Sequence, residues 1–557
     1  MKMLNRISLT YAATTAFVLT LLLAPVAETM AQAEGQKPAL VVSIASVDGL
    51  LGDITYLTKA AGAPEMGGLI NLMAGQYVGG LDTKKPSGIY VNVIGGTPTG
   101  IAFVAVSDFD QVINTIEQSV GELEDVGGGV RKLSLQRDIF IKHQEGWAFI
   151  SDSAANLNGL PDDPTKMLGG LNEQYSIGIR IDVQSIPKQL REMALIEIRS
   201  GFEGAMASQA SNTKEKALQE NLGRQYIDGL SQFMEEADEV TIGWGVDKAG
   251  GRTYLDFSVT ALDGSKLAEQ VAAATNTKSD FTGFLLPEAA ATLHFTSLVT
   301  GQEKAQVLEM LKVLRTIASK ELDNDDDIAD ENVRKLAIEF VHSMVDILNV
   351  TVETGKVNGG AAVLLSPDAV QFVAGGYVAD GRAVEKELKK LVQLAKEADA
   401  GAELENIVFN ASKHRNVDLH TFTVPIPQDE QEARRLLGDR LNVVVGTGPQ
   451  SAYVAFGKDC VELLKRVIDE SATAQTSGPP IAFTVSVGKM LEFASTFQSD
   501  PAVAAMAEAV KAAAGKDSVS ITATALERGI RYRIEVGEAV LSLIGQASRM
   551  QANANEF

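Results

Sequence analysis

The sequence predicts an α+β protein, a tandem duplication of antiparallel β-sheets that pack with amphipathic helices and carry long helical insertions. The first supporting observation is that short strands of alternating apolar residues recur, often in pairs joined by polar turns. The second is that three strands run into a helical pattern at an aspartate, namely Asp108, Asp263 or Asp380. The third is that segment 147–157 resembles segment 453–463.

The three aspartates are expected to be structural. An aspartate in the N-cap position accepts hydrogen bonds from backbone N–H groups, and apolar residues at helical spacing turn one helix face toward a sheet. Apolar residues follow each aspartate four and eight positions later: Val112 and Ile116, Leu267 and Val271, and Val384 and Leu388.

The repeat is expected to divide the chain into two halves, near 38–275 and 285–548. The two similar segments named above are 306 residues apart, and the strand around Ile177 recurs around Phe483 with the same offset. The first and last of the three aspartates are only 272 residues apart. About 34 extra residues are therefore expected in the second copy, near 401–435, because loops tolerate insertions.

Four α+β modules are expected after a signal peptide. The polar stretch 471–480 ends in two prolines and is typical of a linker before the last module. The expected boundaries are 1–33 for the signal peptide, 34–158 and 159–280 for modules 1A and 1B, and 281–470 and 471–557 for modules 2A and 2B.

Within the modules, the spacing of apolar residues predicts long helical insertions at about 187–236 and 300–348. Paired strand patterns predict two hairpins, formed by 241–246 with 253–261 and by 350–355 with 359–366.

The N-terminal segment predicts export. Lys2 and Arg6 precede an apolar stretch, 12–23, and Ala31-Gln32-Ala33 supplies small residues for cleavage after Ala33. The alternative is an uncleaved anchor, but Pro25 interrupts the apolar run well before the roughly 20 residues that span a bilayer. We expect an exported protein in the periplasm, on the cell surface or in the medium.

The charge balance argues against general nucleic-acid binding. The chain has 72 acidic and 49 basic residues and a net charge of −23, and the mature chain of 524 residues would carry −24. No local basic patch is expected, and no later segment has transmembrane length. Cys460 is the only cysteine, so an internal disulfide is excluded.

Three features together resemble a known group of proteins. They are the Ala-Gln-Ala signal, the opening strand-to-helix segment 40–54 and the repeated unit represented by 103–113. They resemble large exported proteins of unknown function, especially those of planctomycete bacteria. The resemblance implies localisation in the cell envelope and a duplicated α+β fold, and it transfers no functional residue.

The sequence contains no complete motif of a serine hydrolase, a nucleotide-binding protein or a dinucleotide-binding protein. No G-x-S-x-G is present, no Gly-Lys pair is followed by Ser or Thr, and Gly446-Thr447-Gly448 lacks the third glycine of a dinucleotide loop. Spacing of the Ser-x-x-Lys kind can activate a serine, but serine is also a favoured helix cap. The three instances are Ser185 with Lys188, Ser211 with Lys214, and Ser486 with Lys489.

Histidines offer little for metal binding, because no H-E-x-x-H motif is present. We expect solvated or packed side chains, with one alternative: His414 and His420 flank Asp418 and could form a surface metal site. The five histidines are His143, His294, His342, His414 and His420.

The acidic segment 323–327 has oxygen ligands at alternate positions, as calcium loops do. Ile328 stands where the glycine should be and Arg334 where the glutamate should be, so we interpret 323–331 as a solvated connection, with weak cation binding as the alternative.

Cys460 could be activated at a helix start, but it aligns with Ala154, which favours a small packed side chain. Trp147 and Trp244 are expected to pack within strands.

No catalytic, cofactor-binding or metal-binding residue is assigned, and no cofactor is expected. We expect a non-enzymatic binding or structural protein of the cell envelope, with envelope proteins or polysaccharide as partners. The alternative is an exported hydrolase that acts on an envelope polymer through an unrecognised carboxylate pair or through Ser486 and Lys489.

Overall fold

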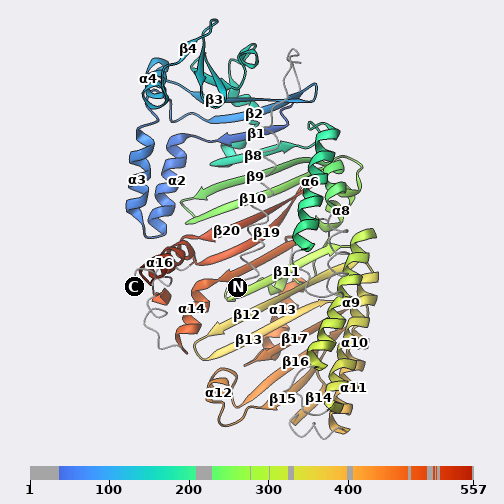
Figure 1. Ribbon diagram of the computed structural model, residues 1–557. Helices are drawn as coiled ribbons and strands as arrows, with labels where there is room; N and C mark the ends of the chain where they lie inside the picture. The colour runs from blue at the N-terminus through green and yellow to red at the C-terminus, as the bar shows by residue number, and fades with distance from the viewer. Residues whose placement is uncertain are drawn as a thin grey trace. The chain divides into compact units, whose positions relative to one another are not determined.

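A computed structural model shows two compact units, unit 1 (Met1–Ala268 with Ile544–Phe557) and unit 2 (Glu269–Leu543) (Figure 1). The predicted signal peptide lies outside the described residues. Those residues are 37–207, 229–275, 277–299, 301–323, 331–397, 405–473, 478–497, 506–508, 510 and 515–554.

Unit 1 contains an antiparallel sheet in the order β4-β5-β6-β7-β3-β2-β1-β8-β9-β10. Its strands are β1 (Leu40–Ile44), β2 (Ser87–Ile94), β3 (Thr97–Ala105), β4 (Glu124–Asp125), β5 (Val130–Ser134), β6 (Asp138–Gln144), β7 (Trp147–Ser151), β8 (Ile177–Asp182), β9 (Ala237–Asp247) and β10 (Arg252–Ala261).

Apolar side chains of the central strands form the core of unit 1. Phe103 and Phe149 are buried there together with Leu157 and Leu168 from the short helices that follow β7. The described helices are α2 (Val47–Ala60), α3 (Pro64–Gly75), α4 (Phe109–Val120), η1 (Ala154–Leu157), η2 (Pro164–Leu168), α5 (Leu171–Gln174) and α6 (Lys188–Ala207), and the chain passes from unit 1 into unit 2 within α8 (Lys266–Thr275).

The strands of unit 2 also pair antiparallel, in the order β14-β15-β16-β17-β13-β12-β11-β18-β19-β20. Its strands are β11 (Ala291–Leu298), β12 (Lys356–Ser366), β13 (Ala369–Tyr377), β14 (Glu405–His414), β15 (Val417–Pro425), β16 (Arg440–Gly448), β17 (Ser451–Gly457), β18 (Ile481–Ser486), β19 (Ser518–Leu526) and β20 (Gly529–Gly537).

The core of unit 2 packs one face of α13 against the sheet. Leu464 and Val467 of that helix are fully buried with Phe284 and Leu419. Helices α9, α10 and α11 lie side by side (Figure 1). The described helices are η3 (Thr282–Phe284), α9 (Gly301–Asp323), α10 (Glu331–Glu353), α11 (Gly381–Glu397), α12 (Gln431–Leu437), α13 (Cys460–Thr473) and α14 (Val487–Ser495), and the chain passes from unit 2 back into unit 1 within α16 (Glu538–Ala554).

The strands of the two units have the same order, with β11 to β20 in the places of β1 to β10. Both units also insert a helix pair after the first strand, α2 and α3 in unit 1 and α9 and α10 in unit 2. In unit 2, β14 and β15 are longer than β4 and β5, and α12 follows β15. This arrangement agrees with a tandem duplication, which itself stays a prediction, as does the division into four modules.

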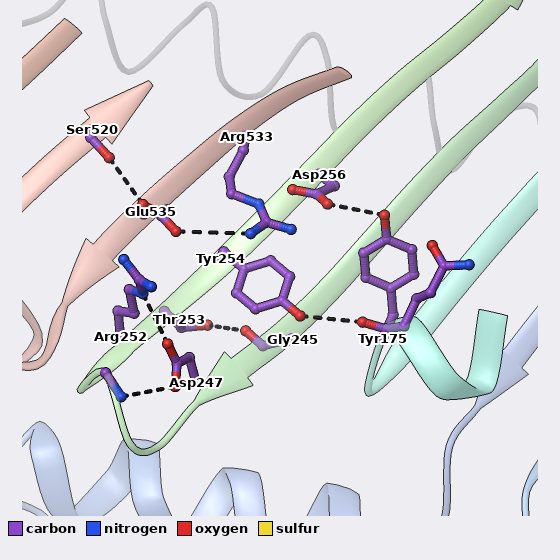
Figure 2. Close-up of polar contacts among 12 residues, drawn as sticks. Tyr175, Gly245, Asp247, Arg252, Thr253, Tyr254, Asp256, Ser520, Arg533 and Glu535 are labelled. Carbon is purple, nitrogen blue, oxygen red and sulfur yellow. Dashed lines mark hydrogen bonds and ion pairs between the residues drawn. The ribbon is translucent and has the colours of Figure 1, made fainter. Parts of the chain in front are cut away.

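The α+β class is confirmed, and so is the hairpin of β9 and β10, whose strands pair antiparallel. Its turn is held by Asp247, which accepts a hydrogen bond from the Gly250 backbone N–H at 2.8 Å and contacts the Arg252 guanidinium at 3.1 Å (Figure 2). The predicted helical stretch 187–236 contains α6, and 300–348 covers α9 and most of α10, which continues to Glu353.

Three sequence predictions are wrong. Residues 350–353 end helix α10, and β12 pairs with β13 instead, because Val352 joins an apolar helical cluster with Val345. Asp263 does not cap α8; the Ser265 hydroxyl accepts from the Ala268 N–H at 3.1 Å. The linker predicted from 471 begins inside α13, which continues to Thr473.

Across the part of the chain that is described, no helix combines the length and the apolar character needed to cross a membrane.

Candidate functional site

Unit 2 contains a pocket of about 470 Å³ between helix α11 and two hairpin ends, those of β14–β15 and β16–β17. Its lining residues are Arg382, Glu385, Lys386, Lys389, Lys413, Asn416, Asp418, Thr447, Gly448 and Pro449.

Helix α11 supplies one wall. It begins after Asp380, whose carboxylate accepts a hydrogen bond from the Arg382 N–H at 2.9 Å, as predicted for an N-terminal aspartate. Val384 and Val392 are buried, and they fix the apolar face of the helix. Arg382 and Lys386 are exposed and one helical turn apart, so they project from the same side of the helix.

The hairpins supply the floor. Lys413 and Asp418 are direct partners across β14 and β15, and their charged groups lie 3.1 Å apart. Asp418 is also the direct partner of Thr447 across β15 and β16. A tight turn at 448–451 joins β16 to β17 and brings Pro449 to the rim.

The pocket carries a local excess of positive charge within an acidic chain. Four lining side chains are cationic and two are carboxylates. Lys389 contacts Glu385 at 2.6 Å, and Lys413 contacts Asp418. Among the described residues, neither Arg382 nor Lys386 has an ion-pair partner within 4.0 Å. This side of α11 therefore carries two cations that are unpaired within the described part of the chain, although the chain as a whole is acidic.

A buried histidine lies beneath the pocket floor. His420 is fully buried on β15, and its Nδ1 accepts a hydrogen bond from the Asn410 backbone N–H at 3.1 Å. A neutral imidazole then carries its proton on Nε2, which lies 2.8 Å from the Thr447 hydroxyl oxygen. The histidine donates, and the Thr447 oxygen accepts.

This hydrogen-bond chain leaves the hydroxyl hydrogen of Thr447 available to the pocket. Thr447 is only 4% exposed, yet it lines the pocket. Burial lowers the pKa of His420. Of the smaller effects on this pKa, the charges of Glu385 and Asp418 raise it, whereas the charge of Lys389 lowers it further. The ring therefore stays neutral near pH 7, and its donor role is fixed.

Ser486 and Lys489, the serine and lysine considered for catalysis, do not contact each other through their side chains. Ser486 is 7% exposed and caps α14, where its hydroxyl oxygen accepts from the Lys489 N–H at 3.2 Å. The Lys489 ammonium instead donates to the backbone oxygens of Pro287 at 2.9 Å and Ala289 at 3.1 Å. The Ser486 hydroxyl donates to Asp517. Ser486 is a structural cap.

The other two Ser-x-x-Lys instances give no site either. Lys188 lies 3.7 Å from Glu192 on the exposed side of α6, and the Ser185 backbone N–H donates to Asp182 at 2.9 Å. Ser211 and Lys214 lie outside the described residues.

The described residues hold no group of three His, Cys, Asp or Glu side chains able to bind a metal ion. His414 and His420, which the sequence places around Asp418, have separate partners: His414 lies 3.0 Å from Asp469, whereas His420 contacts Thr447. Of the acidic segment, 324–330 lies outside the described part of the chain.

The remaining histidines also have local contacts. His143 stacks on Phe109 at 4.7 Å, His294 contacts the Ser279 hydroxyl at 2.7 Å, and His342 contacts the Ser319 hydroxyl at 2.8 Å.

Cys460 and Trp147 are packed, as the sequence predicts. Cys460 is 2% exposed, and burial raises its pKa to about 11. Trp147 is buried in the core of unit 1, where its ring makes a T-shaped contact with Phe103. Trp244 is partly buried and donates to the Thr253 hydroxyl at 2.9 Å.

A carboxylate in unit 1 shows why acidity alone does not identify a site. Asp256 on β10 is fully buried, and the Tyr175 hydroxyl donates to it at 3.0 Å (Figure 2). Because Asp256 is fully buried, a polymer substrate could not contact it. We therefore interpret its contact with Tyr175 as structural.

No family model, curated protein or solved structure matches the chain. The resemblance to large exported planctomycete proteins therefore stays a prediction.

Proposed function

We propose that this chain is an exported, non-enzymatic binding protein of the cell envelope, and that it binds an anionic ligand in the pocket beside α11. The observation that carries the proposal is the pairing pattern of the pocket. Two of its four cationic side chains form ion pairs with carboxylates of the pocket. The other two, Arg382 and Lys386, are available to bind a ligand. Opposite charge attracts anions to such a surface.

The hydrolase alternative has less support. Its serine version fails because Ser486 and Lys489 contact other groups. In the pocket, each carboxylate contacts a lysine ammonium. Such an ion pair favours the ionised carboxylate, which has no proton to donate to a leaving group. Binding is thus the function that the geometry supports best.

The test is calorimetric titration of the mature protein with polygalacturonate and with polyphosphate, with neutral dextran as the reference. We expect at least one anionic polymer to bind. We expect the double variant Arg382→Gln with Lys386→Gln to lose roughly 2- to 30-fold in affinity, because each exposed charge contributes about 0.2–1 kcal/mol.

A matched control removes two lysines outside the pocket, Lys390 of α11 and Lys312 of α9, which are 52% and 70% exposed. Lys390→Gln with Lys312→Gln changes the net charge equally. Equal losses in both double variants, or no binding of either anionic polymer, would refute the proposal.

A further inference from the structure

We propose that the ligand of the pocket beside α11 is an acidic sugar of a polysaccharide, a ring that carries both a carboxylate and hydroxyl groups, and that Thr447 is a specificity-determining donor to it. This inference rests on the proposed binding function and names its ligand class.

The ligand carboxylate is assigned to Arg382 and Lys386. These two side chains are exposed, one helical turn apart and without an ion-pair partner among the described residues. A guanidinium presents parallel N–H donors that match the two oxygens of a carboxylate, and an ammonium adds a further donor. The pair forms a cationic end of the pocket on α11.

The sugar hydroxyls are assigned to Glu385 and Asp418. An ionised carboxylate has about four acceptor sites, so one contact to Lys389 or Lys413 leaves several free. A hydroxyl group can donate to them, whereas a sulfate group or an internal phosphate of a polyphosphate chain has only acceptors and would meet two negative charges. A mixed pocket of this kind favours a ligand with one negative charge and several donors.

Thr447 supplies a donor of fixed direction. Because His420 donates to the Thr447 oxygen, the threonine hydrogen is the one that can point into the pocket. No other acceptor for this hydrogen is found among the described residues. A buried donor that lacks an acceptor is costly, so a ligand oxygen at this position would be favoured.

The corresponding helix of unit 1 lacks this chemistry. Helix α4 has the same place in the strand order as α11, and Asp108 of α4 corresponds to Asp380. At the same offset of 272 residues, Asp110, Asn114 and Glu117 stand in place of Arg382, Lys386 and Lys389. The cationic face therefore belongs to unit 2, although both units share one scaffold.

The test compares four polymers by calorimetry at physiological salt: polygalacturonate, its methyl ester, dextran sulfate and polyphosphate. The methyl ester keeps every hydroxyl and removes the charge. We expect polygalacturonate to bind at least tenfold more tightly than each of the other three.

Two variants of Thr447 test its role. Thr447→Ser keeps the hydroxyl and should bind polygalacturonate within about twofold of the wild type. Thr447→Val removes it and should weaken binding several-fold, with a smaller effect on any residual binding of dextran sulfate. Because Val also leaves the His420 Nε2 donor unpaired, circular dichroism and melting temperature verify that each variant is folded. Asp418→Asn provides an independent variant that leaves Thr447 intact, and it should also weaken binding of polygalacturonate.

The outcomes separate the two proposals. Tighter binding of dextran sulfate or polyphosphate would overturn the acidic-sugar assignment and leave the anion-binding function standing. If the methyl ester bound as tightly as polygalacturonate, the ligand carboxylate would have no role in recognition. Unchanged affinity in folded Thr447→Val would overturn the donor role. Failure of every anionic polymer to bind would overturn both proposals.

Discussion

Ser486 and Asp517 are joined by a hydrogen bond in which the serine hydroxyl donates, and the same carboxylate accepts from the Gly488 N–H at 3.1 Å. The serine also caps α14, so it links the helix start to the segment before β19. A residue that stabilises a helix in this way should affect stability when it is removed.

The variant Ser486→Ala should therefore lower the unfolding midpoint of unit 2. Loss of a serine cap costs about 1 kcal/mol, and the Lys489 N–H loses its side-chain acceptor. Urea denaturation followed by circular dichroism measures the shift, with Ser495→Ala, near the exposed end of the same helix, as the control. An unchanged midpoint together with loss of a hydrolytic activity would favour the enzyme alternative.

The fold class was predictable because its signals are local. Alternating apolar residues identify β9 and β10, and Asp108 does cap α4, where it accepts from the Gln111 N–H at 3.0 Å. The error at Val350 and Val352 has a physical reason: β-branched residues favour strands locally, whereas burial against neighbouring helices decides the outcome here.

The pocket was not predictable in the same way. Its cations come from α11 and from a hairpin about 30 residues later, and they converge only after the sheet has formed. One signal was available: Arg382, Lys386 and Lys389 recur at helical spacing after a capping aspartate, in an otherwise acidic chain. The link from His420 to Thr447 depends on strand register, which the sequence pattern leaves open.

Cys460 should resist thiol reagents while the protein is folded. Its side chain is buried, and burial raises its pKa to about 11, so the reactive thiolate is scarce near pH 7. Ellman's reagent should label the native protein very slowly and label one thiol per chain after unfolding in urea. Rapid labelling of the native protein would show instead that α13 opens readily or that the thiol is activated.

Export makes a prediction about the mature chain. Cleavage after Ala33 leaves a chain that begins at Glu34, so mass spectrometry of protein purified from the periplasmic or envelope fraction should find that N-terminus. An Ala31→Lys variant disrupts the small-residue site and should accumulate in the uncleaved form. Recovery of the wild-type chain with residues 1–33 intact would favour the uncleaved anchor.

The two buried histidines predict how stability depends on pH. His294 and His420 are both fully buried, and burial lowers the pKa of each below its usual value near 6.5. The unfolded chain therefore binds more protons than the folded chain in this range, so stability rises with pH. The contribution of the two histidines to stability is complete above their pKa in the unfolded chain. It is lost as the pH falls through their pKa values in the folded chain.

Melting temperature measured from pH 8 to pH 5 should fall toward the acid side, in a window above the range in which ion-paired carboxylates such as Asp469 titrate. The variant His420→Gln keeps a side-chain donor for Thr447 and removes the titration, so it should flatten the slope. His143→Gln serves as the control, because His143 is exposed and stacks on Phe109. If His420→Gln retains the full wild-type slope, His420 does not contribute to it, and protonation elsewhere controls the acid side.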